Sequence, residues 1–140
     1  MPLTPEQMDE KIDKHFGFEA ADDIDGVLAT LAHDAEHDIV GWPTGPTHGR
    51  NGARSFYETL FHDLADGKVE CRRRLYGEDF LVDESLWRGK AAGKPFGLDG
   101  KGRPLEFRLL HVIEFAPDGD LKREQVWIDL ASIIRQLPQE

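Results

Sequence analysis

Apolar residues in the first half of the chain recur at helical spacing. A capping box, Thr4-Pro5-Glu6-Gln7, predicts the start of a first helix, because the threonine and glutamine side chains satisfy free backbone amides there. A second helix is predicted over Asp23–Ala32 and a third over Arg50–Ala65, each from an apolar residue at every third or fourth position. Glu36–Val40 favours a short strand between them, and Gly67 is expected to end the third helix.

From Val69 onward the apolar residues alternate with a period of two. This pattern predicts four strands and a final helix, over Val69–Tyr76, Phe80–Arg88, Leu105–Phe115, Leu121–Ile128 and Asp129–Leu137. Helices that precede a run of antiparallel strands indicate the α+β class and not alternating βαβ units. Residues 89–104, rich in glycine and lysine, are expected to form a long, mobile connection that can serve as a lid.

Length and composition narrow the class of protein. A chain of 140 residues has the size of one domain, predicted to span residues 1–140. The 17 Lys and Arg against 27 Asp and Glu give a net charge of −10, so nucleic acid and membrane are not expected as partners, because both require a basic surface. A single cysteine, Cys71, and the lack of a secretory or membrane-spanning pattern predict a cytoplasmic protein.

His111 is the strongest candidate for a catalytic side chain. Alternation in the strand Leu105–Phe115 places it on a face whose other five residues are all apolar. Burial there disfavours the imidazolium, so a lowered pKa and a neutral ring are expected. Such a ring can accept a proton or donate a hydrogen bond to a developing oxyanion. The alternative is a core histidine satisfied by a backbone carbonyl.

Two further histidines are predicted to point inward. His15 falls on the apolar stripe of the first helix, and His37 alternates with Ile39 in the short strand. A structural role is the alternative for His15. The segment His33–Asp38 is dense in possible metal ligands, but it lacks the glutamate directly after the first histidine that a helical zinc motif needs, so no metal site is predicted.

Aromatic residues supply a candidate ligand pocket. Three tryptophans in a small domain are many for packing alone, and tryptophan often lines cavities. Core packing remains the alternative for each of them. The predicted substrate-binding residues are Trp42, Tyr57, Phe61, Trp87, Phe107 and Trp127.

Several short motifs occur together in one order between about Ile12 and Leu137. They are Asp23–Ala32 with Asp34-Ala35, Gly49-Arg50, Phe56-Tyr57, Trp87-Arg88-Gly89, Gly97-Leu98 with Gly102-Arg103-Pro104, Asp118-Gly119, and Trp127-Ile128-Asp129 with Arg135-Gln136-Leu137. With these motifs the chain resembles the nuclear-transport-factor-two-like superfamily, and within it the SnoaL-like polyketide cyclases and the ketosteroid isomerases. The resemblance implies a cone-shaped, curved antiparallel sheet packed on N-terminal helices and a C-terminal helix, with one apolar pocket, in a homodimer.

The resemblance also implies positions for catalytic groups. His111 falls where ketosteroid isomerases place a protonated aspartic acid, and His15 falls near their oxyanion-hole tyrosine. Their basic aspartate falls at Asp38 or at Ile39, and in the second case His37 or Asp38 would replace it. The chain is therefore expected to be an isomerase, cyclase or lyase without metal or organic cofactor, which moves a proton beside a carbonyl of a small apolar, steroid- or polyketide-like ring compound. The alternative is a non-catalytic ligand-binding or dimerisation module of this fold.

Overall fold

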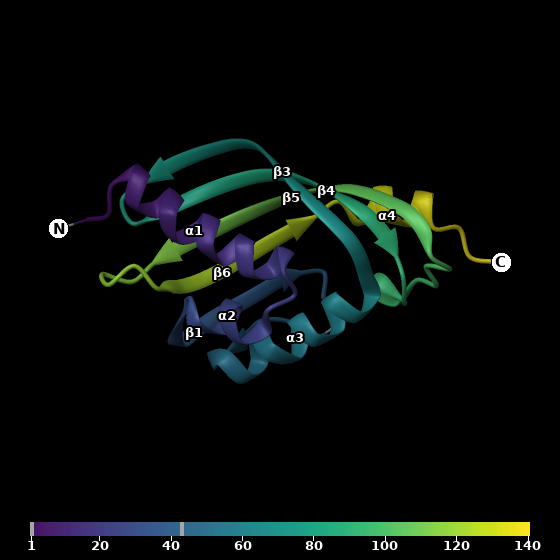
Figure 1. Cartoon of the computed structure of the whole chain (residues 1–140), viewed down its shortest axis with the longest axis horizontal. Coiled ribbons are helices and arrows are strands. Elements are labelled where there is room, and N and C mark those ends of the chain that lie inside the picture. The colour runs from purple at the N-terminus through teal and green to yellow at the C-terminus, as the bar shows by residue number, and fades with distance from the viewer. Residues whose placement is uncertain (1, 43) are drawn as a thin grey trace.

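A curved sheet and the helices packed on one side of it make up the molecule (Figure 1). The computed structural model describes residues 2–42 and 44–140, and these form four α-helices and six strands. The helices are α1 (Pro5–Ala20), α2 (Ile24–Ala29), α3 (Gly49–Asp63) and α4 (Leu130–Gln136). The strands are β1 (Leu31–Val40), β2 (Thr47–His48), β3 (Leu64–Gly77), β4 (Phe80–Ala91), β5 (Arg103–Phe115) and β6 (Leu121–Ile128), with a short 3₁₀ turn at Pro95–Gly97.

The strands follow one another in the order β2-β1-β6-β5-β4-β3. This arrangement confirms the α+β class. Every neighbouring pair is antiparallel except β1 and β6, which run parallel, whereas an antiparallel sheet was expected throughout. A parallel pair needs a long crossover connection, and here nearly the whole middle of the chain, from Val40 to Leu121, supplies it. The local hairpin patterns of the later strands therefore carry no information about this pairing.

The predicted starts of the helices agree with the structure better than the predicted ends. Thr4 forms the predicted capping box with Gln7, and Asp23 caps α2. The third helix ends at Asp63, not at Gly67, because Leu64 already pairs with Ala91 in the sheet. Gly67 instead lies within β3, at an irregularity in its pairing with β4. A Cβ there would lie 2.7 Å from Nε1 of Trp87, so the close approach of the indole requires glycine.

At the start of β6, this strand contains one residue more than the segment of β5 with which it pairs. Leu121 pairs with Phe115 and Arg123 pairs with Glu114, so two steps along β6 match one step along β5. This is a β-bulge at Lys122. After the bulge the alternation is shifted, and Glu124 and Val126 are buried while Trp127 is 49% exposed.

The core is divided between two clusters. The larger one joins α1, α2 and α3 to the middle of the sheet, and its largest buried members include Tyr57 and Phe115. The smaller one lies at the other end, where Ile133 and Leu137 pack with Phe107. Within the described residues, no helix is long and apolar enough to cross a membrane.

Candidate functional site

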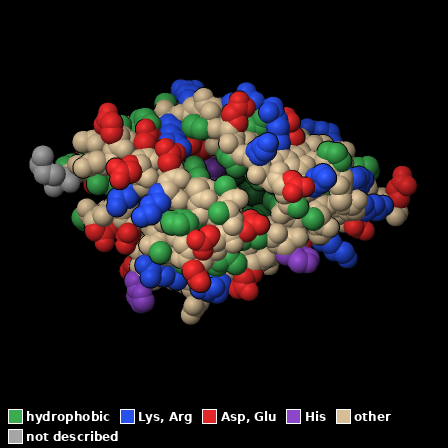
Figure 2. Space-filling view, viewed as in Figure 1, with side chains coloured by type: hydrophobic (Ala, Val, Ile, Leu, Met, Phe, Trp, Pro, Cys, Tyr) green, Lys and Arg blue, Asp and Glu red, His purple; other side chains and the backbone are tan. Residues whose placement is uncertain are grey.

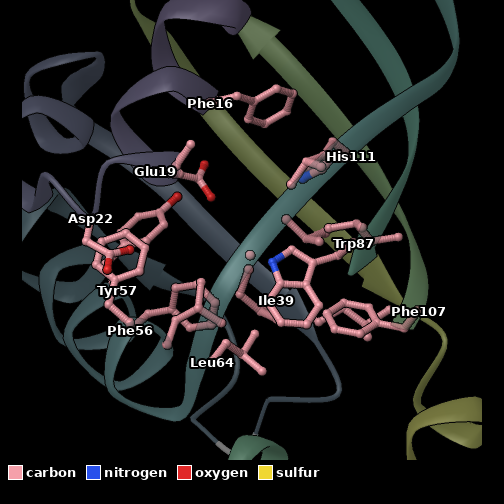
Figure 3. Close-up of a pocket in the computed structure, with 18 of the residues that line it drawn as sticks. Phe16, Glu19, Asp22, Ile39, Phe56, Tyr57, Leu64, Trp87, Phe107 and His111 are labelled. Atoms are coloured by element: carbon pink, nitrogen blue, oxygen red, sulfur yellow. The ribbon is translucent and has the colours of Figure 1, made fainter. Parts of the chain in front are cut away.

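A cavity of about 340 Å³ lies between the helices and the sheet. Figure 2 shows a hollow in the middle of this face of the molecule with hydrophobic side chains inside it, and Figure 3 shows a close-up of the cavity. Its volume is in the range of small-molecule sites. Its walls are mostly apolar and aromatic and come from α1, α3 and strands β1 and β3 to β6. The residues that line it include Phe16, Glu19, Ile39, Phe56, Tyr57, Phe61, Leu64, Trp87, Phe96, Phe107, His111, Glu124 and Val126.

Four of the six aromatic residues predicted to bind substrate line this cavity: Tyr57, Phe61, Trp87 and Phe107. Trp42 lies beside it and contributes to a smaller cavity together with His37. Trp127 points to the outer face of the sheet, which corrects the prediction that it lines the pocket. The reason is the bulge in β6, because counting alternate residues from the buried Leu121 wrongly places Trp127 inside.

Asp38, predicted as a possible base, lies on the face of β1 opposite to the cavity. Its carboxylate accepts a hydrogen bond of 3.1 Å from Gln125 and lies 3.9 Å from Arg123. Ile39 lines the cavity instead. Asp38 is therefore not placed to act on a ligand there.

His111 lines the cavity and is held by a buried carboxylate. Asp83 lies directly opposite it in the pairing of β4 with β5, and Nδ1 of His111 is 3.2 Å from Oδ1 of Asp83. Asp83 is fully buried and His111 is 4% exposed. Among the described residues, Nε2 of His111 has no hydrogen-bond partner, so it is the ring nitrogen left for a ligand. The face of β5 is apolar as predicted, but the pattern of one strand did not include the charge of Asp83 from the neighbouring strand.

Asp83 is itself the centre of a network. It accepts hydrogen bonds from Ser85 and from Nε of Arg74, the latter at 2.8 Å. Arg74 also pairs with Asp9 at 2.9 Å and Asp13 at 2.6 Å, both on α1. Burial opposes ionisation of Asp83, but the hydrogen bonds from His111, Ser85 and Arg74 outweigh it and hold the pKa of the carboxyl below its ordinary value. His111 therefore lies beside a permanent negative charge that orients its ring.

A second buried cluster surrounds Glu124 of β6. Its members Glu19, Tyr57 and Glu124 line the cavity, whereas His15 and His37, predicted as catalytic, are not among the described residues that line it. Glu124 is 2% exposed and accepts a hydrogen bond of 2.8 Å from the hydroxyl of Tyr57. Its other oxygen lies 3.1 Å from Nε2 of His15, and Nε2 of His37 lies 3.3 Å from the first oxygen. Nε2 of His15 is also 2.8 Å from Glu19, near the end of α1. The structure thus brings His15 and His37 together on one carboxylate.

Burial and charge shift the ionisation of this cluster. Burial works against a charged Glu124, but the charge of His15 and its hydrogen bond prevail, and the pKa of Glu124 is held well below its ordinary value. Burial and the nearby carboxylates together raise the pKa of Tyr57 well above its ordinary value. Glu124 is therefore an anion in the wall of the cavity, and Tyr57 keeps its proton.

Asp83, Glu19 and Glu124 were not predicted as site residues. Asp83 shares a strand face with the buried Leu81, so a carboxylate on an apolar face was the available signal. Glu124 was hidden by the bulge, and Glu19 by its place at a helix end. Figure 3 shows Glu19 and Tyr57 on one side of the cavity and His111 on another.

A family model matches most of the chain. The model of the SnoaL-like polyketide cyclase family matches residues 17–137. No protein of curated function matches the chain in sequence.

Solved structures share the fold at low sequence identity. A putative SnoaL-like polyketide cyclase from Jannaschia sp. CCS1 has a TM-score of 0.85 at 16% identity, over 100% of this chain and 99% of that chain. A protein from Catenulispora acidiphila with a ketosteroid isomerase-like fold, solved in complex with trimethylamine, has a TM-score of 0.77 at 14% identity, over 99% and 96%. An epoxide hydrolase from M. tuberculosis of the LEH-like type has a TM-score of 0.71 at 16% identity, over 94% and 89%. The shared fold is the α+β cone.

Proposed function

Because the chain belongs to the SnoaL-like polyketide cyclase family, we propose that it is an enzyme that moves a proton beside a carbonyl group of a small, apolar ring compound. His111 is the catalytic acid–base group of this proposal. The observation that carries it is the arrangement of the ring: Nδ1 is bonded to the buried Asp83, and Nε2 is left without a partner beside an apolar cavity. Acid–base catalysis by a positioned histidine contributes about 10²- to 10⁴-fold to a rate.

Asp83 is a positioning residue in this proposal. Its carboxylate accepts a hydrogen bond from Nδ1–H of His111, so the lone pair of the neutral ring lies on Nε2. When Nε2 takes a proton from the carbon beside the carbonyl, the negative charge of Asp83 stabilises the imidazolium. In an isomerisation the same ring then returns the proton to another carbon of the substrate. In a ring closure the carbanion instead attacks a second carbonyl carbon of the substrate, the π bond of that carbonyl breaks, and the ring gives its proton to the oxygen.

The lining of the cavity supports a neutral substrate. The described residues around it include four carboxylates, Glu19, Asp22, Asp66 and Glu124, and neither lysine nor arginine. A carboxylate or phosphate on the ligand would be repelled. The aromatic walls, with Trp87 stacked on Phe107 at 5.2 Å between ring centres, suit a flat ring system.

Hydrogen–deuterium exchange tests the proposal without knowledge of the natural product. Ring ketones, enones and aromatic polyketides are first ranked by the rise in Tm they cause. The best binders are then incubated in D₂O, and loss of the proton beside the carbonyl is followed by NMR. We expect His111→Gln to slow the exchange at least about 10²-fold. His62→Gln, which changes an exposed histidine that does not line the cavity, is the matched control and should exchange at the wild-type rate.

Two results distinguish this enzyme from the non-catalytic alternative. Exchange at equal rates in His111→Gln and wild type would remove His111 from the reaction. Tight binding without exchange in wild type would favour a ligand-binding module. A homodimer and a cytoplasmic location, which the sequence predicts, remain part of the proposal, and sedimentation of the purified chain tests the first of them.

A further inference from the structure

In the cluster around Glu124, two carboxylates lie against one nitrogen, and a single proton on that nitrogen cannot satisfy both of them. Nε2 of His15 lies 2.8 Å from Oε2 of Glu19 and 3.1 Å from Oε2 of Glu124. A single N–H bond is directed at one acceptor, and here the hydrogen bond goes to Glu124. Oε2 of Glu19 is buried and has no hydrogen-bond partner among the described residues. Two buried carboxylate oxygens therefore share one N–H, and a further cation beside them would be stabilised.

The ring of His15 is oriented as in many metal sites. The hydroxyl of Thr30 donates to the carbonyl of Val27 at 2.6 Å, so it can only accept from Nδ1 of His15, which lies 2.6 Å away. Nδ1 therefore bears a proton, and Nε2 is the nitrogen turned toward the carboxylates. Metal-ligating histidines usually donate their other N–H to such a partner. The Tyr57 hydroxyl on Glu124 plays the same role for the carboxylate.

A second, independent feature is the orphaned nitrogen of His37. This side chain is 3% exposed, and its Nε2 lies 3.3 Å from Oε1 of Glu124 without forming a hydrogen bond. It comes from β1, whereas His15 belongs to α1 and Glu124 to β6. A buried polar nitrogen without a partner beside this carboxylate is a second indication that the cluster is incomplete without a bound group.

From these observations we propose that His15, Glu19 and Glu124 bind one divalent transition-metal ion, while His37 lies beside the other oxygen of Glu124. The ligand atoms of the first three lie within 4.8 Å of one another. Nε2 of His15 lies 2.8 Å from Glu19 and 3.1 Å from Glu124, which is close to the separation of about 3 Å between ligands of an ion with bonds of about 2.0–2.2 Å. Nitrogen and carboxylate oxygen suit Zn²⁺, Co²⁺, Fe²⁺ or Mn²⁺.

The ion would face the cavity, because Glu19 and Glu124 line it. Two carboxylates balance its charge, so the preference for a neutral substrate is kept. Its open position would hold a carbonyl or hydroxyl oxygen of the ligand and polarise it. Metal binding is measured without substrate, so it stands or falls apart from the acid–base role of His111.

Titration of the chelator-treated chain with Co²⁺ and with Zn²⁺ tests the site. We expect one ion per chain, visible d–d absorption of Co²⁺ typical of nitrogen and oxygen ligands, and displacement of Co²⁺ by Zn²⁺. Glu19→Gln should raise the Kd at least about tenfold. This variant preserves the fold, because the Glu19 side chain is 23% exposed at a helix end, and its folding is checked by circular dichroism.

The control is His62→Gln. His62 also lies beside a carboxylate, at 3.1 Å from Asp63, but its side chain is 81% exposed. The loss of His62 should leave the stoichiometry and the Kd of metal binding unchanged. No stoichiometric uptake by the wild type would overturn the proposal and leave His15 as a buried imidazolium. Uptake that persists in Glu19→Gln and disappears in His62→Gln would overturn it equally, by placing the ion on the surface.

Discussion

Replacing Asp83 with asparagine tests the network that holds His111. The substitution keeps the size of the side chain but removes the charge that Arg74 and His111 share. Removing one partner of a buried ion pair costs about 3–5 kcal/mol. Arg74 keeps Asp9 and Asp13 as partners, so we expect the lower end, about 3 kcal/mol. With an unfolding entropy of about 2.1 cal/mol/K per residue, that corresponds to a fall in Tm of about 10 °C.

Urea and thermal unfolding, followed by circular dichroism, measure this loss. Asp9→Asn is the matched control, since it removes a different partner of the same Arg74. Asp9 is 38% exposed in its side chain, and exposed ion pairs contribute only about 0.2–1 kcal/mol. Its Tm should therefore fall by no more than about 3 °C.

The comparison of the two variants shows whether Asp83 is held as a buried anion. If Asp83→Asn costs no more than Asp9→Asn, the carboxylate is not held as a buried anion. The tautomer assigned to His111 would then lose its support. A large loss in Asp83→Asn alone would show that the buried part of the network carries the free energy of unfolding.

Two further predictions concern Asp83 and the glycine that lies against Trp87. Because the folded-state pKa of Asp83 is lowered, its contribution to stability is present above its unfolded pKa of about 3.9 and is lost as the pH falls through the folded value. The difference in urea midpoint between wild type and Asp83→Asn should therefore narrow between pH 5 and pH 3. A constant difference would contradict the lowered pKa. Gly67→Ala places a methyl group against the indole of Trp87, so we expect a loss of about 1–3 kcal/mol and a shifted tryptophan fluorescence spectrum, whereas unchanged values of both would contradict the close approach.

The elements that follow from local chemistry could be predicted from the sequence. The capping box at Thr4 begins α1 as expected, and the alternation in β5 places His111 on the inner face. Both depend on residues only a few positions apart. The α+β class follows from the order of such elements, so it too was accessible.

The partners of the candidate site residues could not be predicted from such local patterns. Asp83 meets His111 through the pairing of β4 with β5, and Glu124 meets His37 through the parallel pairing of β6 with β1. The second pair is separated by 87 positions in the chain, and no local pattern specifies that register. An inward-pointing histidine can be predicted from one strand, but its charge partner depends on how two strands align.

The bulge at Lys122 has a consequence for how such a cavity changes in evolution. The bulge decides which face of β6 looks inward, and it lies outside the cavity lining. If β6 paired without the bulge but kept all its residues, the rest of the strand would turn by one position, withdraw the carboxylate of Glu124 and present the indole of Trp127 in its place. Deletion of Lys122 itself would remove the extra residue and leave Glu124 inside. An acidic wall would become an aromatic one through a shift of one residue in register, without any substitution in the pocket. The gain or loss of a bulge at a strand end is therefore a route by which descendants of one scaffold acquire different ligands.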